Sequence, residues 1–340
     1  MKRVLIATLF AATAGLAQTA PGQPTTGPGG SSYPHGGVVT KGPYIPPEFQ
    51  NDPDFQYFIF EPARPTPAQA AVVLFLHGYQ GHKPAMYWGW IAHMVRKGYT
   101  VVWVRWDQGG VTTWKFADQA QVGWKDALNR LVNNTWEGHV PPARDGSGNL
   151  VTAMAGHSAG GWLSAVLAGR SADVANGMPM PRAIVAIEPG GPPLIPAGPF
   201  EDIDPTTKLV LVAGEDDSIV CIETAKTLWE RTAQIPGANR DFLLVRTDTR
   251  GTPQQVANHW FPTTAGTLDT ATVDARDFFV TFKLSVGALN CRFKGTDCQY
   301  ALGNGAVEQT WMGRWSDSIP VKPMLWVADP STLTAACEGP

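Results

Sequence analysis

One short stretch of the chain predicts a buried strand, a tight turn and a helix in direct succession: residues 151–169, VTAMAGHSAGGWLSAVLAG. Residues 151–155 are mostly apolar without alternation, which is typical of a strand covered on both faces of a sheet. Small and apolar residues continue over 161–169 as a helix. Between them lies GHSAG at 156–160, a G-x-S-x-G sequence whose glycines remove side chains from a very sharp turn. The stretch therefore predicts that Ser158 lies at the end of a strand, in front of a helix N-terminus.

Apolar runs of the same kind recur along the rest of the chain. They cover residues 55–60, 71–76, 100–104, 183–187, 208–213 and 242–245. Between the runs, apolar residues follow the spacing of one helix face, as over 124–132 and 225–232. Strands that alternate with helices predict the α/β class, with a doubly wound, mostly parallel sheet and helices on both faces.

The composition excludes several classes of protein. Of the 340 residues, 44% are hydrophobic and 16% are charged, which excludes an intrinsically disordered chain. The 36 glycines and 29 prolines recur throughout and no heptad persists, which excludes a coiled coil. A formal net charge of −3 offers no basic surface, so we expect no nucleic-acid partner.

Two further residues are expected to form a proton-transfer chain with Ser158. Where this motif follows a strand, the order along the chain is nucleophile, acid, histidine. Of the seven histidines, only His259 lies beyond Ser158, in the loop after the strand at 242–245. Asp217 follows the strand at 208–213 and is the favoured acid, with the role of orienting His259. Glu188, at the end of the preceding strand, is the alternative acid and otherwise lines the cleft.

The turn at residues 77–81, HGYQG, follows the strand that supplies half of an oxyanion hole in such proteins. We expect the backbone N–H groups of Tyr79 and Ala159 to bind the oxygen of a tetrahedral intermediate. A plain glycine turn with a core tyrosine is the alternative interpretation. The residues expected to line the substrate cleft are Tyr79, His157, Trp106 and Glu188.

Taken together, these motifs resemble the α/β-hydrolase superfamily over residues 71–285. Within it, HGY at 77–79, GHSAGG at 156–161 and EDDSI at 215–219 are most similar to the branch of cutinases, bacterial polyester hydrolases and dienelactone-hydrolase-like proteins. The chain differs from the polyester hydrolases in carrying His77 where they usually have proline and Ala159 where they usually have methionine.

The resemblance implies a serine esterase of the α/β-hydrolase fold. Ser158 would attack the carbonyl of a carboxylic ester, small or polymeric, while His259 takes the proton and Asp217 orients His259. No metal and no organic cofactor is expected, and the chain is expected to be a monomer. A peptidase or amidase with the same three residues, and a non-catalytic binding protein on a hydrolase scaffold, are the alternatives.

Residues 1–20 are predicted to be a secretory signal peptide. Lys2 and Arg3 precede an apolar run over 4–17, shorter than the ~20 residues that cross a bilayer. We therefore expect a secreted protein, extracellular or periplasmic, without a membrane span. The rest is predicted to comprise a flexible Pro/Gly-rich leader (21–50), the catalytic domain (51–286) and a disulfide-bearing tail packed on that domain without clear helical period (287–340).

Four cysteines suit export to an oxidising compartment. Cys291 and Cys298 lie close together in a predicted Gly-containing loop and are the favoured pair, which leaves Cys221 to bond Cys337. Free buried thiols are the alternative. The spacing of the four matches no zinc site.

Overall fold

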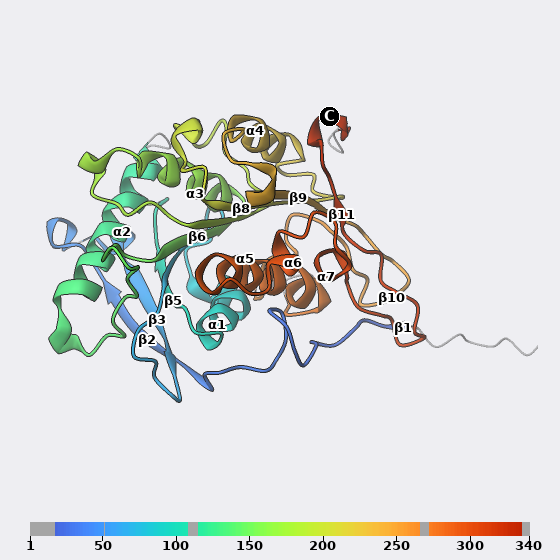
Figure 1. Ribbon diagram of the computed structural model, residues 1–340, viewed down its shortest axis with the longest axis horizontal. Helices are drawn as coiled ribbons and strands as arrows, with labels where there is room; N and C mark the ends of the chain where they lie inside the picture. The colour runs from blue at the N-terminus through green and yellow to red at the C-terminus, as the bar shows by residue number, and fades with distance from the viewer. Residues whose placement is uncertain (1–17, 51, 108–114, 266–271, 335–340) are drawn as a thin grey trace, which may run out of the picture.

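The computed structural model describes residues 18–50, 52–107, 115–265 and 272–334, and a large twisted sheet lies at its centre (Figure 1). Over these residues the sheet has nine strands in the order β11-β9-β8-β7-β6-β4-β5-β3-β2. The strands are β2 (Gly37–Tyr44), β3 (Tyr57–Ala63), β4 (Val72–Leu76), β5 (Thr100–Val104), β6 (Thr152–His157), β7 (Ala183–Ile187), β8 (Lys208–Gly214), β9 (Arg240–Val245) and β11 (Leu325–Trp326). Within this order, all neighbouring strands between β9 and β5 are parallel. β11 pairs antiparallel with β9, and β3 pairs antiparallel with both β5 and β2. The predicted α/β class with a mostly parallel sheet is confirmed.

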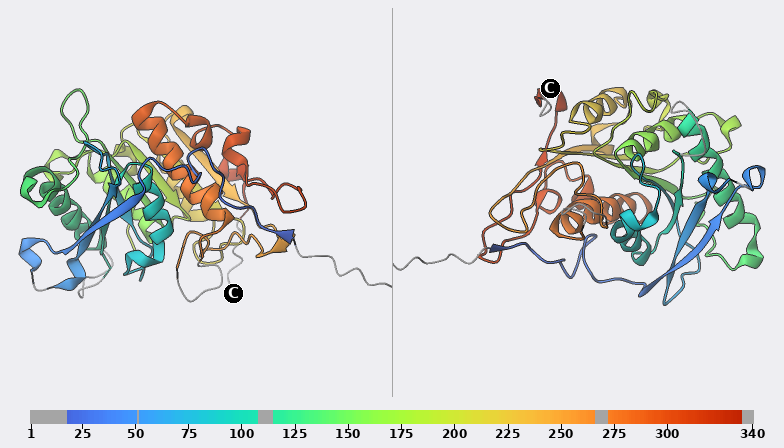
Figure 2. Two further views of the ribbon diagram at one scale, coloured as in Figure 1. Left: turned by 90° about the horizontal axis from the view of Figure 1, so that it is seen from below. Right: turned by 180° about the vertical axis from the view of Figure 1, so that it is seen from behind.

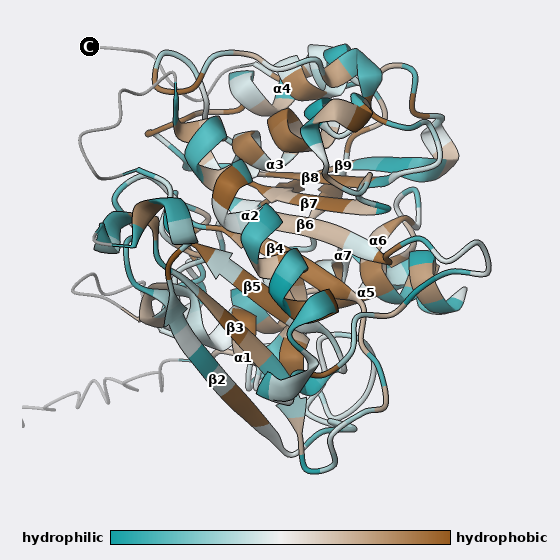
Figure 3. Ribbon diagram, turned by 90° about the vertical axis from the view of Figure 1, so that its left-hand side faces the viewer, coloured by the Kyte–Doolittle hydropathy of each residue, from teal (hydrophilic) through white to brown (hydrophobic). Residues whose placement is uncertain are grey.

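Helices cover both faces of this sheet. The helices α2 (Phe116–Asn133), α3 (Ala159–Arg170) and α4 (Glu223–Arg231) lie on one face, and α1 (Trp88–Arg96) and α5 (Phe282–Lys294) lie on the other. Two short helices, α6 (Cys298–Ala301) and α7 (Val307–Thr310), follow α5. Figure 3 shows hydrophobic central strands between helices and loops that carry most of the hydrophilic residues. The continuous apolar strands thus bury side chains in two cores, one on each face.

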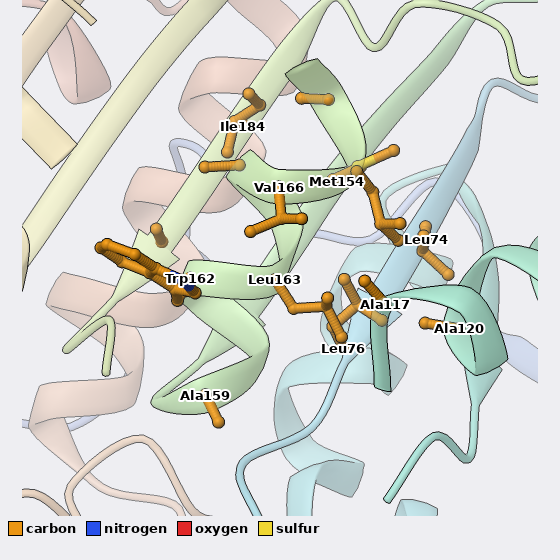
Figure 4. Packing of buried hydrophobic residues seen from close by; sticks show 14 of the residues in the cluster. Leu74, Leu76, Ala117, Ala120, Met154, Ala159, Trp162, Leu163, Val166 and Ile184 are labelled. Atoms are coloured by element: carbon orange, nitrogen blue, oxygen red, sulfur yellow. The ribbon is translucent and has the colours of Figure 1, made fainter. Parts of the chain in front are cut away.

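The first of these cores anchors the helix that follows Ser158. Figure 4 shows Trp162, Leu163 and Val166 of α3 packed among side chains of the sheet and of α2. Their partners on the strands are Leu74, Leu76, Met154 and Ile184. Each such buried side chain contributes roughly 1.5–3 kcal/mol to folding, so the N-terminus of α3 is held firmly against the sheet.

The prediction of a flexible leader over residues 21–50 is wrong, because β2 lies within it and pairs with β3. Before β2, the N-terminal segment crosses the outer side of α1 and α5 (Figure 2), where Pro28 O accepts a hydrogen bond from His93 Nε2 (2.7 Å). β2 is an edge strand with mostly exposed side chains, so its composition resembles that of a loop. Of the predicted signal peptide, residues 1–17 lie outside the described residues. The two residues of β1 (Gln18–Thr19) pair parallel with β10 (Gly251–Thr252).

The boundary predicted at residue 286 falls inside α5, so the expectation of a tail without helices is also wrong. α5, α6 and α7 are helical, and β11 joins the sheet beside β9. α5 is buried on all sides from Phe282 to Cys291, polar residues included, so its sequence lacks the one-sided apolar period of a surface helix. Among the described helices, none has the length and apolarity needed to span a bilayer.

The predicted disulfide between Cys291 and Cys298 is confirmed. It joins the last turns of α5 to the first residue of α6 rather than closing a loop. The predicted partner of Cys221, Cys337, lies outside the described residues.

Candidate active site

Ser158 occupies the turn between β6 and α3, in a strained backbone conformation. Its φ is 54° and its ψ is −128°, values that cost a non-glycine residue about 1–3 kcal/mol. A Cβ on Gly160 would lie 2.0 Å from the carbonyl oxygen of Leu76, and one on Gly156 would lie 2.4 Å from that of Gly160. Close backbone packing therefore requires both glycines. We call residues 156–160 the serine turn.

His259 and Asp217 complete a hydrogen-bonded chain with the serine. His259 Nε2 lies 2.9 Å from Ser158 Oγ, and His259 Nδ1 lies 2.8 Å from Asp217 Oδ2. A carboxylate can only accept, so Nδ1 carries the proton and Nε2 is free to accept from the serine hydroxyl. Such a chain lets the imidazole draw the proton from Oγ and makes the oxygen nucleophilic.

Asp217 is itself held in place by the backbone that follows it. Its Oδ1 accepts hydrogen bonds from the N–H groups of Ile219 (2.8 Å) and Val220 (3.1 Å). Of the two acids considered from the sequence, the structure brings Asp217 into hydrogen-bond contact with His259. It places Glu188 beside the pair instead.

His259 belongs to a loop after β9 that side chains from other segments hold in place. We call residues 246–261 the histidine loop. The backbone N–H of Thr247 donates to Glu215 Oε2 (2.8 Å), and its hydroxyl donates to Asp216 Oδ2 (2.5 Å). The same hydroxyl accepts from Ala257 N–H (2.9 Å). Nothing in the sequence around Glu215 and Asp216 links these side chains to a loop thirty residues away.

The turn after β4, residues 77–82, presents one free backbone donor between two that are occupied. Gly78 N–H donates to Tyr87 Oη (2.9 Å), and Gln80 N–H donates to Asp107 Oδ2 (2.5 Å). The N–H of Tyr79, between them, has no acceptor within the described part of the chain, and neither has that of Ala159 at the start of α3. Both residues line the same cavity as Ser158, so two N–H groups remain for the oxygen of a ligand.

A cavity of about 390 Å³ lies in front of Ser158 and His259. No Asp, Glu, Lys or Arg is among the described residues that line it. Much of its wall is apolar and was not identified from the sequence: Met86, Pro192, Pro193, Leu194, Ile219 and Trp260. The GGPPL stretch at 190–194 begins three residues after the end of β7, and this position at the edge of the sheet was the one available signal.

The four residues expected to line the cleft differ in their actual positions. Tyr79 lines the cavity with 43% of its surface exposed, and His157 lines it from below while 1% exposed. In contrast to the prediction, Trp106 is fully buried and stacks on His77 with 4.9 Å between ring centroids. Glu188 is likewise buried away from the cavity wall. The edge of a sheet does not by itself decide whether a side chain points inward or outward.

Burial shifts the pKa values of Glu188 and His157 towards their uncharged forms. Burial, together with the negative charge of Asp217, raises the pKa of Glu188 well above its usual range. Burial also lowers the pKa of His157 well below its usual range. Ligand atoms of His157, Glu188 and His259 lie within 4.8 Å of one another, as in some metal sites. Both ring nitrogens of His259 already bond Ser158 and Asp217, so we assign no metal there.

None of the protein-family models matches this chain, and no curated protein has a significantly similar sequence.

Proposed function

We propose that this chain is a secreted serine hydrolase of the α/β-hydrolase fold that cleaves carboxylic esters. The observation that carries the proposal is the unbroken hydrogen-bond chain Asp217–His259–Ser158 beside a cavity with two unoccupied N–H donors. The order of the elements supports it, since the serine, the acid and the histidine follow β6, β8 and β9 in turn. The Cys291–Cys298 disulfide is consistent with export to an oxidising compartment.

In the proposed reaction, Ser158 Oγ forms a bond to the ester carbonyl carbon while His259 Nε2 takes the hydroxyl proton. The N–H groups of Tyr79 and Ala159 bind the resulting oxyanion. The bond to the alcohol oxygen then breaks, and His259 returns the proton to the leaving alcohol. A water molecule then attacks the acyl carbon while His259 takes its proton; the bond to Ser158 Oγ breaks, His259 returns the proton to Oγ, and the acid is released.

The cavity wall favours an uncharged ester. A charged acyl or alcohol group would lose its hydration against apolar side chains, with no opposite charge among the lining residues that the structure describes. We therefore expect neutral p-nitrophenyl esters to be hydrolysed faster than analogues that carry a carboxylate in the acyl chain.

Substitution of Ser158 by alanine tests the proposal. We expect S158A to lose on the order of 10⁴-fold or more in kcat with p-nitrophenyl butyrate, and to fail to react with a fluorophosphonate probe. The matched control is S171A at the other end of α3, whose hydroxyl bonds Leu167 O (2.8 Å) away from the cavity. Retention of more than a tenth of the activity by S158A, with S171A unchanged, would exclude Ser158 as the nucleophile.

A further inference from the structure

Three buried hydrogen bonds run from the 77–82 turn to the backbone of His259. Gly78 N–H donates to Tyr87 Oη (2.9 Å), and Tyr87 Oη lies 2.9 Å from His157 Nδ1. His157 Nε2 in turn lies 2.9 Å from the carbonyl oxygen of His259. Tyr87 and His157 are each 1% exposed.

The two end groups, Gly78 N–H and the carbonyl of His259, set the direction of all three hydrogen bonds. A backbone carbonyl can only accept, so His157 Nε2 carries a proton and donates it to His259 O. In a neutral ring Nδ1 is then bare and accepts from the Tyr87 hydroxyl, whose oxygen remains free to accept from Gly78 N–H. The Glu188 carboxyl lies 3.5 Å from His157 Nε2, farther than the carbonyl. One placement of the protons therefore gives a partner to every donor and acceptor in the series.

These hydrogen bonds connect the segments that carry the Tyr79 oxyanion donor, the nucleophile and the base. Gly78 directly precedes Tyr79, which offers the oxyanion donor, and His157 directly precedes Ser158. At the other end of the series, His157 Nε2 bonds the backbone carbonyl of His259, the proposed base. A Cβ on Gly78 would lie 2.9 Å from Tyr87 Oη, so the hydroxyl occupies the space beside the turn and limits its movement.

We propose that Tyr87 and His157 are positioning residues that fix the distance between the oxyanion donor of Tyr79 and the imidazole of His259. The inference rests on the proposed esterase function. Neither residue exchanges a proton with the substrate. Their effect is to hold two loops from distant parts of the chain in one geometry, which oxyanion stabilisation and proton transfer both require.

The first test removes a single oxygen. Y87F keeps the ring, which packs on Phe75 with 5.2 Å between centroids, but leaves Gly78 N–H and His157 Nδ1 without their partner. We expect kcat to fall at least about tenfold, short of the ~10²–10³-fold loss on deletion of an oxyanion donor, with KM within about twofold. The matched control is Y99F, which removes an equally buried hydroxyl that bonds Asn290 Oδ1 (2.5 Å) far from the cavity. Y99F should leave kcat unchanged.

The second test asks whether the two residues act as one unit. H157L removes both hydrogen bonds of the ring, whereas H157Q retains a donor and an acceptor and should recover part of the lost kcat. If the chain acts as a unit, Y87F/H157L loses no more than H157L alone, because either change breaks the same connection. A merely structural role would lower the melting temperature without this split between kcat and KM or this coupling.

The possible outcomes separate this inference from the proposed function. An inactive S158A together with a Y87F variant whose kcat stays within twofold of the wild type would overturn the positioning role and leave the esterase assignment standing. Losses that multiply in the double variant would also overturn it. An active S158A would remove the proposed function itself.

Discussion

The serine turn and the histidine loop meet at two hydrogen bonds to His259, from Ser158 and from His157, but are held in place by different physical means. The serine turn is fixed by contacts within the backbone, since Gly160 packs directly on the carbonyl oxygen of Leu76. The histidine loop is fixed by polar side chains from elsewhere, such as Glu215 and Asp216 on Thr247. Changes to the glycines of the turn should therefore act mainly on folding, and changes around the loop should act mainly on turnover.

The largest effect is expected from the acid that orients His259. In D217N the amide no longer provides the charge that holds the imidazole in its active tautomer, so we expect kcat/KM to fall by about 10⁴-fold. E188Q should lose less than about tenfold, because Glu188 makes no hydrogen bond to His259 and its burial raises its pKa, which favours the uncharged form that glutamine resembles. The kcat/KM values of D217N and E188Q are both measured with p-nitrophenyl butyrate. A reversed ranking of the two variants would make Glu188 the acid.

The next largest effect concerns the turn and is one of stability. A methyl group at Gly160 would lie 2.0 Å from Leu76 O, so the strand or the helix must move. We expect G160A to lower the free energy of unfolding by more than about 2 kcal/mol, measured by urea denaturation. The control is G146A in an exposed turn, where a Cβ meets nothing within 4 Å. Equal stability of the two variants would show that the turn is not held by backbone packing.

A smaller effect should appear in the histidine loop, and in activity rather than stability. T247V keeps the shape of the side chain but loses the bonds of its hydroxyl to Asp216 and Ala257. Because slight misplacement of a reacting group is costly, we expect kcat to fall by about tenfold while stability drops by only about 1 kcal/mol. T227V on α4, which loses a hydroxyl bond to Glu223 O, serves as the control. A change in stability without a change in kcat would contradict the contrast between loop and turn.

A pH dependence of stability is expected from His77, whose carbonyl oxygen packs under Gly160. Burial lowers the pKa of His77 from 6.5 to about 4, so the unfolded chain binds this proton at higher pH than the folded one. The free energy of unfolding should therefore fall as the pH drops from 6.5 towards 4, by at most about 1.4 kcal/mol per pH unit from this group.

The variant H77F isolates this contribution, because a phenyl ring can still stack between Trp103 and Trp106. The difference in unfolding free energy between pH 7 and pH 4.5 should be smaller in H77F than in the wild type. The same comparison with H35Q, at a partly exposed histidine, provides the control. If the difference in unfolding free energy between the two pH values is the same in H77F as in the wild type, the acid sensitivity arises from groups other than His77.

The contrast between turn and loop also explains what the sequence could reveal. β6, Ser158 and α3 are specified by residues next to one another, so their pattern predicted them, as it did the other parallel strands. His259 and Asp217 could be proposed because the motif implies an order along the chain.

What could not be predicted depends on contacts between distant segments. β2 is an edge strand whose glycines and proline look like a linker, and α5 is buried on all sides from Phe282 to Cys291, so no one-sided apolar period marks it. The ring of Trp106 is buried because His77 stacks on it, and no local signal announces that contact. The bonds that join Tyr87, His157 and His259 are likewise invisible until the fold brings them together.

The two outer strands of the sheet bear on how these molecules behave when crowded together. An open strand edge is where β-aggregation between copies begins. At one edge β11 is only two residues long, and at the other β2 carries Lys41 and Pro43 with a register shift between Lys41 and Tyr44. Proline has no N–H to offer and a lysine resists burial, so neither edge is a good template for another strand. The sheet should therefore resist edge-to-edge aggregation in concentrated solution even though its centre is strongly hydrophobic.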